Sequence, residues 1–377
     1  MIVGVPLELK TGESRVAMTP DGVRELVAHG HHVLVEAGAG EASSIADADF
    51  AGAGAGLASA EEAWAAEMVV KVKEPQEDEV GRLRRDQVLF TYLHLAAYRE
   101  VAKALLAAGT TALAYETVQL QDGTLPLLAP MSEVAGRMAT QIGAHYLERE
   151  NGGRGVLLGG APGVRPATVV VLGAGNVGWN AAWIAQGMEA EVWLLDKNLD
   201  RLRFVDQIHQ GRILTLASNR GAVERAVVEA DLLIGAVLVP GGRAPTVVTD
   251  DMVRAMKPGA VIVDIAVDQG GCVATTRETT HDDPVYEVHG VTHYAVGNVP
   301  GAVPHTSTYA LTNATLPFVL ELAERGVRGA VEHDAALRRG VTTVDGRVTN
   351  TAVAEALGTA SADPLACLAG GALPGRP

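Results

Sequence analysis

Aromatic residues and cysteines are scarce in this chain. Aromatic side chains make up 4% of its 377 residues, whereas 43 residues are glycine. Because small side chains allow helices to pack closely on a sheet, this composition favours helix-on-sheet layers over an all-β sandwich. The two cysteines, Cys272 and Cys367, lie far apart in the sequence and form no Cys-x-x-Cys pattern. We therefore expect a reducing compartment and no disulfide framework.

Basic residues are also in deficit. The chain has 30 Lys and Arg against 45 Asp and Glu, which gives a formal net charge of −15. An acidic surface repels phosphate backbones, so a nucleic-acid partner is not expected. The same charge is compatible with one local basic pocket for a small anion.

Long hydrophobic runs are missing as well. No stretch approaches about 18 apolar residues without a charge or a turn signal, so no membrane span is expected. The first residues, MIVGVPLELK, mix charged and apolar side chains and do not resemble a signal peptide. With 48% apolar residues the chain is expected to fold as a globular protein, and we predict a cytoplasmic location.

Stretches typical of α/β units fill the first part of the chain. Residues 1–6 are predicted to form a short strand, and residues 19–30 a helix that begins with a Thr-Pro cap and ends at a glycine. Four continuous apolar runs follow later, as expected for strands buried on both faces of a parallel sheet. These runs are residues 167–173, 191–196, 230–237 and 260–267.

Two long helical segments are expected to link the parts of the fold. Residues 132–150 carry apolar side chains at helical spacing, and residues 307–326 form a second long helix with an expected break at Pro317. The second helix is predicted to return the chain to its first domain. We therefore predict an α/β fold of two Rossmann-like, doubly wound domains, in which a dinucleotide-binding domain is inserted between parts of a substrate domain. The predicted domains are 1–128 plus 307–377 for the substrate and 129–306 for the dinucleotide.

A glycine-rich turn, GAGNVG, occupies residues 173–178. A strand leads into it and a helix-compatible run follows it, which is the context that a dinucleotide-binding G-x-G-x-x-G turn requires. Asp196 ends the next predicted strand, 18 residues beyond Gly178. A carboxylate at that position accepts hydrogen bonds from ribose hydroxyls and repels a 2′-phosphate, which favours NAD over NADP. The alternative is a glycine-rich turn that binds no ligand.

Four polar residues stand in apolar or glycine-rich surroundings. Arg15 precedes the first helix and is suited to hold a carboxylate, unless it is a surface arginine. Lys73 follows the run MVVKV and is a candidate to contact an anion or a carbonyl, unless it is a solvated lysine. His94 directly follows the apolar run VLFTYL, at the strand end where ligands gather in open α/β sheets, unless it is a hydrogen-bonded core histidine. Asp268 follows another buried strand and is expected to face the cofactor crevice.

Other polar residues are expected to be structural. Lys71 is expected to point to the other face of its strand than Lys73. Asp264 is expected to be a buried acid with a backbone partner. No set of metal ligands emerges, because Gly290 interrupts any helix between His289 and His293.

Specific sequence blocks run along nearly the whole chain, from Met1 to about Gly358. They include ELKTGESRVAMTP, KVKEP, LFTYLHLA, APMSEVAGRMA, VVLGAGNVG, DIAVDQGG and TSTYALTNATLPFVLELA. In these blocks the chain resembles the bacterial L-alanine dehydrogenase family. The amino-terminal half of proton-translocating nicotinamide nucleotide transhydrogenase is similar too, but the last two blocks favour the dehydrogenase.

The resemblance implies an enzyme that uses NAD to convert L-alanine reversibly to pyruvate and ammonium, usually as a homohexamer. It implies that Arg15 and Lys73 contact the substrate carboxylate and carbonyl, and that His94 and Asp268 are the catalytic pair. The cofactor-binding residues that it implies, together with those of the glycine-rich turn, are Ser132, Gly173, Gly175, Asn176, Val177, Gly178, Asp196, Arg201, Ser218, Val237, Leu238, Ile265, Ala266, Val267, Asp268, Arg277, Val296, Gly297, Asn298 and Val299.

Two residues depart from the family's pattern. Val299 stands where many members carry Met, near the nicotinamide, so cofactor affinity is expected to differ while the chemistry is retained. Some members bind magnesium through a Glu and a His of the late helix. Glu321 matches the Glu, but Arg325 replaces the His, and we therefore predict no metal.

Two other enzyme classes remain open beside an alanine dehydrogenase. One is a transhydrogenase-like NAD(H)-binding subunit, and the other is a dehydrogenase of another small amino acid. A non-catalytic NAD-binding protein is a third possibility. The joint presence of Arg15, Lys73, His94 and Asp268 argues against it.

Overall fold

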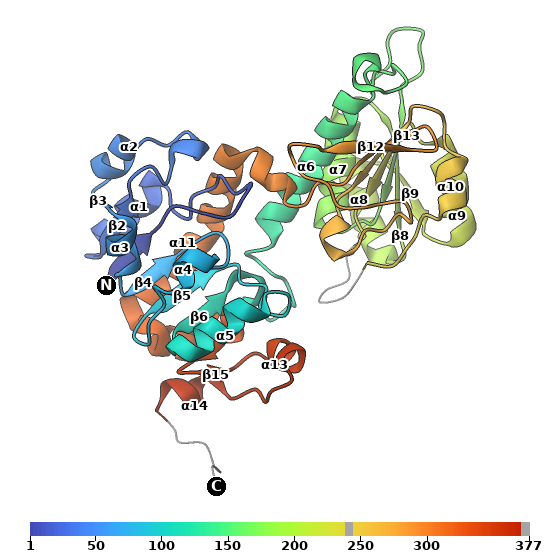
Figure 1. The fold of residues 1–377 in the computed structure, drawn as a ribbon. Helices are drawn as coiled ribbons and strands as arrows, with labels where there is room; N and C mark the ends of the chain where they lie inside the picture. The colour runs from blue at the N-terminus through green and yellow to red at the C-terminus, as the bar shows by residue number, and fades with distance from the viewer. Residues whose placement is uncertain (238–243, 371–377) are drawn as a thin grey trace. The chain divides into compact units, whose positions relative to one another are not determined.

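The computed structural model describes residues 1–237 and 244–370, and the chain divides into two units (Figure 1). The first unit comprises Met1–Met131 and Val303–Pro377, and the second comprises Ser132–Ala302. Each unit is built around one β-sheet. Among the described residues, no helix is both long enough and apolar enough to cross a membrane.

The sheet of the first unit has a parallel core in doubly wound order. β1 (Ile2–Val5) lies between β2 (His32–Glu36) and β4 (Met68–Val70), so the direction of winding reverses beside β1. The full order is β15-β14-β6-β5-β4-β1-β2-β3, in which β14 and β15 are antiparallel additions from the end of the chain. The remaining strands are β3 (Gly56–Ala58), β5 (Val88–Thr91), β6 (Thr111–Ala114), β14 (Val341–Val344) and β15 (Arg347–Val348).

Helices cover both faces of this sheet. Successive residues of β4 point to opposite faces, and Met68 and Val70 join one hydrophobic core while Val69 joins another. The first core includes residues of α1 and α11, and the second includes residues of α5. The helices of this unit are α1 (Pro20–Ala28), α2 (Asp47–Gly52), α3 (Ala60–Trp64), α4 (Glu77–Val80), α5 (Arg99–Ala108), α11 (Pro304–His333), α12 (Ala335–Gly340), α13 (Thr351–Leu357) and α14 (Pro364–Leu368).

The sheet of the second unit repeats the doubly wound order. β7 (Thr168–Leu172) lies between β8 (Glu191–Asp196) and β10 (Leu232–Gly235), and the order is β12-β13-β11-β10-β7-β8-β9. All neighbours are parallel except β12, which pairs antiparallel with β13. The other strands are β9 (Leu214–Ala217), β11 (Val261–Asp264), β12 (Val285–Val288) and β13 (Val291–Tyr294). The prediction of two Rossmann-like domains is therefore confirmed.

Two helices of the second unit approach each other closely. A Cβ on Gly136 of α6 would lie 2.2 Å from the carbonyl oxygen of Val177 of α7, and Thr140 donates a hydrogen bond to the carbonyl of Ala181 at 2.8 Å. A glycine at this crossing lets the two backbones meet. The helices are α6 (Ala129–Tyr146), α7 (Asn176–Gly187), α8 (Leu199–His209), α9 (Arg220–Glu229) and α10 (Asp250–Arg254).

The two long linking helices differ from their predicted form. The helix predicted at 132–150 ends at Tyr146. The break predicted at Pro317 is wrong, because α11 continues through it and loses helical geometry at Gly326, where φ is 65° and ψ is 166°. Proline has a φ that suits a helix and removes only one hydrogen bond, whereas glycine alone adopts a positive φ readily.

Candidate active site

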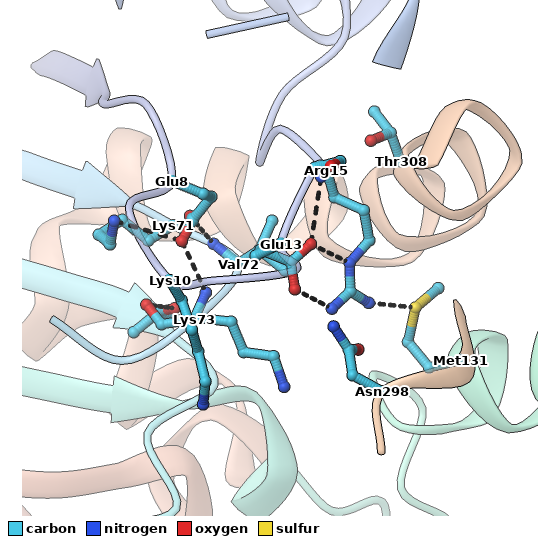
Figure 2. Close-up of polar contacts among 12 residues, drawn as sticks. Glu8, Lys10, Glu13, Arg15, Lys71, Val72, Lys73, Met131, Asn298 and Thr308 are labelled. Atoms are coloured by element: carbon cyan, nitrogen blue, oxygen red, sulfur yellow. Dashed lines mark hydrogen bonds and ion pairs between the residues drawn. The ribbon is translucent and has the colours of Figure 1, made fainter. Parts of the chain in front are cut away.

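Arg15 lies in the loop between β1 and α1 and is almost fully buried, with 3% of its surface exposed. Its guanidinium forms a bidentate ion pair with Glu13, whose carboxylate accepts hydrogen bonds from Nε at 2.6 Å and from Nη2 at 2.5 Å (Figure 2). Nη1 lies 2.8 Å from the sulfur of Met131. Burial alone would raise the pKa of Glu13, but the hydrogen bonds and charge of Arg15 lower it. The alternative of a surface arginine is therefore wrong.

Lys73 follows β4, the strand beside β1, and is half-buried. Burial and the neighbouring charge of Arg15 lower the pKa of the Lys73 amine. The two cations thus lie close enough to repel each other, which is the arrangement that an anionic substrate group relieves. Lys71 has the opposite environment, because it is fully buried between Glu8 and Glu79.

His94 follows β5, the next strand along the sheet. Its backbone has a φ of 45°, which is uncommon for a residue other than glycine. Glu116 holds this turn, since its carboxylate accepts from the N–H of His94 at 2.6 Å and from the N–H of Leu93 at 3.2 Å. The imidazole stacks on Tyr92 at a centroid distance of 5.9 Å, and 40% of the side chain is exposed. His94 is therefore not a buried core histidine.

The three predicted residues of the first unit share one edge of its sheet. They follow β1, β4 and β5, which are consecutive strands in the sheet order. The strand order reverses between β1 and β4, and small ligands of doubly wound folds bind at this point, outside the carboxyl ends of the strands. Arg15, Lys73 and His94 therefore lie at the sheet edge where doubly wound folds commonly bind small ligands.

The glycine-rich turn of the second unit joins β7 to α7. Gly173 has a φ of 101°, and a Cβ on Gly178 would lie 1.7 Å from the carbonyl oxygen of Gly173. Gly175 is the N-cap residue of α7, and Asn176 and Val177 begin the helix. The first N–H groups of α7 therefore have no side-chain cap, which is the geometry that receives a phosphate.

Asp196 ends β8, as predicted, and its carboxylate braces the glycine-rich turn. It accepts from the N–H of Ala174 at 2.6 Å and from the N–H of Asn198 at 2.7 Å. Arg201 lies 3.9 Å from the same carboxylate, and 57% of its side chain is exposed.

The loop after β11 is organised by Asp264. This buried carboxylate accepts from the N–H groups of Ala266, Cys272 and Val273 and from the hydroxyl of Thr276, at distances of 2.8 to 3.2 Å. Burial raises the pKa of Asp264, and these hydrogen bonds act against the rise. Asp264 is thus the structural acid that the sequence predicted.

Asp268 lies in the turn that follows, and a Cβ on Gly297 would lie 3.0 Å from one of its carboxylate oxygens. The remaining predicted cofactor residues are distributed around the carboxyl edge of the second sheet. Ser132 lies in the first turn of α6, Ser218 follows β9, Val237 follows β10, Ile265, Ala266 and Val267 follow β11, and Val296, Asn298 and Val299 follow β13. Arg277 stacks on Tyr286 at 4.1 Å. Leu238 lies outside the described residues.

Known proteins match the chain over nearly its full length. The family model for the alanine dehydrogenase/PNT N-terminal domain matches residues 4–135, and that for the C-terminal domain matches residues 139–351. The chain belongs to the alanine dehydrogenase/PNT family. The alanine dehydrogenase of Mycobacterium tuberculosis (strain ATCC 25618 / H37Rv) is 57% identical over 371 residues, which cover 98% of this chain and 100% of the relative.

Solved structures of two kinds are similar to this member of the family. An L-alanine dehydrogenase is 52% identical, has a TM-score of 0.93, and is matched over 95% of this chain and 99% of its own. A transhydrogenase from Sinorhizobium meliloti is 27% identical, with a TM-score of 0.81 over 93% of this chain and 100% of its own.

The sequence patterns missed three carboxylates of this family member's first unit. Glu13 binds Arg15, Glu116 accepts from the N–H of His94, and Glu8 accepts from the N–H of Lys73. Only Glu13 could have been found from the local sequence, because it stands two residues before Arg15 in the segment Glu-Ser-Arg. The other two lie far in sequence from the residues whose N–H groups they accept from, and only the folded sheet brings them to the site.

Glu321 of α11, the carboxylate considered above as a magnesium ligand, is paired with basic side chains. Glu321 lies 2.6 Å from Nε of Arg325 and 2.8 Å from Nδ1 of His333. Across the described part of the chain, no group of three or more His, Cys, Asp or Glu side chains is arranged to hold a metal ion.

Proposed function

We propose that this chain catalyses the reversible, NAD-dependent oxidative deamination of L-alanine to pyruvate and ammonium. The chain is an alanine dehydrogenase by its relatives, which carry that name at 52–57% identity over nearly their full length. The structural observation that supports the chemistry is the gathering of Arg15, Lys73 and His94 at the reversal point of the first sheet. NAD, the residue roles and the steps below are the parts that we propose.

The first unit is proposed to bind alanine through its carboxylate. Arg15 stays protonated at any working pH, and Glu13 fixes the plane of its guanidinium. Lys73 is the nearby second cation, whose lowered pKa reflects burial and the charge of Arg15. A carboxylate between them removes that repulsion, so alanine is held with its Cα in a fixed orientation.

The second unit fits a dinucleotide. Its glycine-rich turn leaves no room for a side chain at Gly178 and exposes the backbone at Gly175, where a pyrophosphate approaches closely. Asp196 at the end of β8 favours a free 2′-hydroxyl over a 2′-phosphate, which supports NAD rather than NADP. When bound, the nicotinamide accepts a hydride from the substrate.

His94 is proposed to move the protons of the hydrolysis step. Loss of hydride from Cα leaves an imine, and a water molecule adds to it while His94 takes the water's proton. His94 then returns this proton to the amine nitrogen, and the C–N bond breaks as the hydroxyl oxygen becomes the carbonyl of pyruvate. The departing ammonia takes up the hydroxyl proton and leaves as ammonium. An imidazole suits this step because its ordinary pKa of about 6.5 lies near neutral pH. Asp268 is proposed to stabilise the positive charge that develops on the imine nitrogen.

Initial rates of NADH formation from a panel of small L-amino acids, with NADP as a parallel cofactor, test this function. We expect a clear preference for L-alanine and NAD, with faster deamination at alkaline pH because the amine must be unprotonated to release hydride. His94→Ala is expected to abolish turnover and to leave NADH binding intact. Turnover of another amino acid in preference to alanine would reassign the substrate.

If no amino acid of the panel is oxidised and NADH still binds, a transhydrogenase-like subunit would be favoured instead. The similarity to the transhydrogenase structure, at 27% sequence identity, is the reason to consider this alternative. A homohexamer and a cytoplasmic location stay predictions from the sequence. Light scattering in solution would test the hexamer.

A further inference from the structure

Three charged side chains that the proposed mechanism does not use form a buried cluster around Lys71. The ammonium of Lys71 lies 2.8 Å from Oε1 of Glu79 and 3.3 Å from Oε2 of Glu8. The exposed fractions of the three side chains are 0%, 1% and 2% for Lys71, Glu79 and Glu8. Removing such charges from water is costly, and a well-packed apolar cluster is often as stable. Stability alone therefore does not explain why these three charged side chains are buried together.

Glu8 joins this group to the backbone of the site. Its Oε1 accepts from the N–H of Val72 at 2.6 Å, and its Oε2 accepts from the N–H of Lys73 at 3.3 Å (Figure 2). Glu8 belongs to the loop after β1, whereas Val72 and Lys73 follow β4. One carboxylate thus ties together the two loops that flank the reversal point of the sheet.

Glu79 shares the ammonium but not the backbone contacts. Its Oε2 accepts from the N–H of Gln76 at 2.7 Å, in the cap of α4. Glu8 and Glu79 are therefore matched in burial and in partner, and they differ in whether they hold the peptide of Lys73.

We propose that Glu8 is a positioning residue that fixes the backbone of Lys73 and so places its amine for the substrate carboxylate. This inference rests on the proposed function of Lys73. Burial raises the pKa of the Glu8 carboxyl, and the charge of Lys71 and the N–H of Val72 offset only part of that rise. An ionised carboxylate accepts at both oxygens, and three donors converge on Glu8.

Glu8→Gln and Glu79→Gln in the full-length chain form the matched test. A glutamine at position 8 has one acceptor oxygen, so its NH₂ group faces either the N–H of Val72 or both Lys71 and the N–H of Lys73, and at least one backbone contact to the loop after β4 is lost. We expect Glu8→Gln to raise the KM for L-alanine and for pyruvate about tenfold or more, as for a lost hydrogen bond to a charged group. The dissociation constant for NADH is expected to stay the same. Glu79→Gln is expected to leave both KM values within about threefold, although both variants unfold at lower temperature.

A second readout needs no turnover. An amine-reactive acylating reagent labels Lys73, and peptide mass spectrometry measures the rate of labelling. This rate depends directly on the accessibility and reactivity of the Lys73 amine. We expect Glu8→Gln to change that rate and Glu79→Gln to leave it near that of the wild type. If the wild type itself does not oxidise alanine, the proposed function fails, and the labelling rate still decides the role of Glu8.

Equal KM values and equal labelling rates in the two variants would overturn the proposal and make Glu8 a structural ion-pair partner. If Glu8→Gln does not fold, Glu8→Asp replaces it, because aspartate keeps the charge opposite Lys71 and is one methylene too short to hold the Lys73 N–H. Wild-type KM and labelling in a folded Glu8→Asp would equally refute the positioning role.

Discussion

Two glycines of one turn should respond differently to the same added methyl group, one in stability and the other in cofactor binding. Gly175→Ala and Gly178→Ala each place a Cβ in the loop between β7 and α7. At Gly178 the new atom would lie 1.7 Å from the carbonyl oxygen of Gly173, which is backbone and cannot rotate away. At Gly175, where φ is −76°, the nearest heavy atom is Nη1 of Arg201 at 3.9 Å.

The expected stabilities follow from these distances. At Gly178 the backbone has to separate by more than about 1 Å in a close-packed interior, which costs about 3 kcal/mol or more. Such a loss lowers the unfolding temperature of a unit of this size by roughly 6–12 °C. At Gly175 the alanine lowers the conformational entropy of the unfolded chain, which stabilises the folded state by about 0.4–1 kcal/mol. Alanine is also a poorer N-cap residue than glycine, which destabilises the folded state by about as much. The net change in the free energy of unfolding there is within about 1 kcal/mol.

Cofactor binding should separate the same variants. The methyl group of Gly175→Ala occupies the surface that a pyrophosphate approaches, so NADH affinity is expected to fall at least about tenfold, or about 1.4 kcal/mol. Gly187→Ala is the control, because this glycine of the same helix has no neighbour within 4 Å. Circular dichroism melts and NADH fluorescence titrations measure both quantities. A Gly175→Ala that binds NADH like Gly187→Ala, or a Gly178→Ala that melts like the wild type, would refute this reasoning.

Two further outcomes follow from buried carboxylates. The pKa of Glu13 is lowered in the folded chain, so its pairing with Arg15 stabilises fully above the unfolded-state pKa of about 4.3 and is lost as pH falls through the folded value. Urea unfolding between pH 6 and pH 3 should show the free-energy gap between wild type and Glu13→Gln shrinking, and a constant gap would contradict the pairing. Asp264→Asn turns an NH₂ group toward backbone donors and should cost about 3 kcal/mol of unfolding free energy and weaken NADH binding, whereas unchanged urea midpoints would count against its role.

The sequence predicted those parts of the structure that local pattern determines. Thr19 caps α1 with its side chain, Pro20 begins the helix, and the four apolar runs became β7, β8, β10 and β11. Each signal lies within one element, so the chain needs no distant partner to reveal it. The glycine-rich turn was predictable for the same reason, since strand, turn and helix are adjacent in the sequence.

Features that depend on distant partners were not predictable. The sequence around Arg15 left the alternative of a surface arginine open, and only the folded loop shows the side chain buried against Glu13. The expectation that Lys71 points to the other face than Lys73 does not follow from strand alternation, because residues two apart in a strand share a face. Nothing in the sequence around Lys71 indicates that it pairs with Glu8, 63 residues earlier in the chain. The sequence also did not predict that α11 remains helical at Pro317 and loses helical geometry at Gly326, because the backbone angles at each position depend on how the whole helix packs.

The two sheets show why the same topology carries different chemistry in each unit. Both reverse their strand order beside the first strand, so both offer a site at the same edge. In the second unit residues 173–175 alone separate strand from helix, and the uncapped N–H groups of α7 stand at that edge. In the first unit residues 6–19 intervene, and this longer loop brings Glu8, Glu13 and Arg15 there instead. A short loop presents backbone dipoles suited to a pyrophosphate, and a long loop presents paired side-chain charges suited to a small carboxylate.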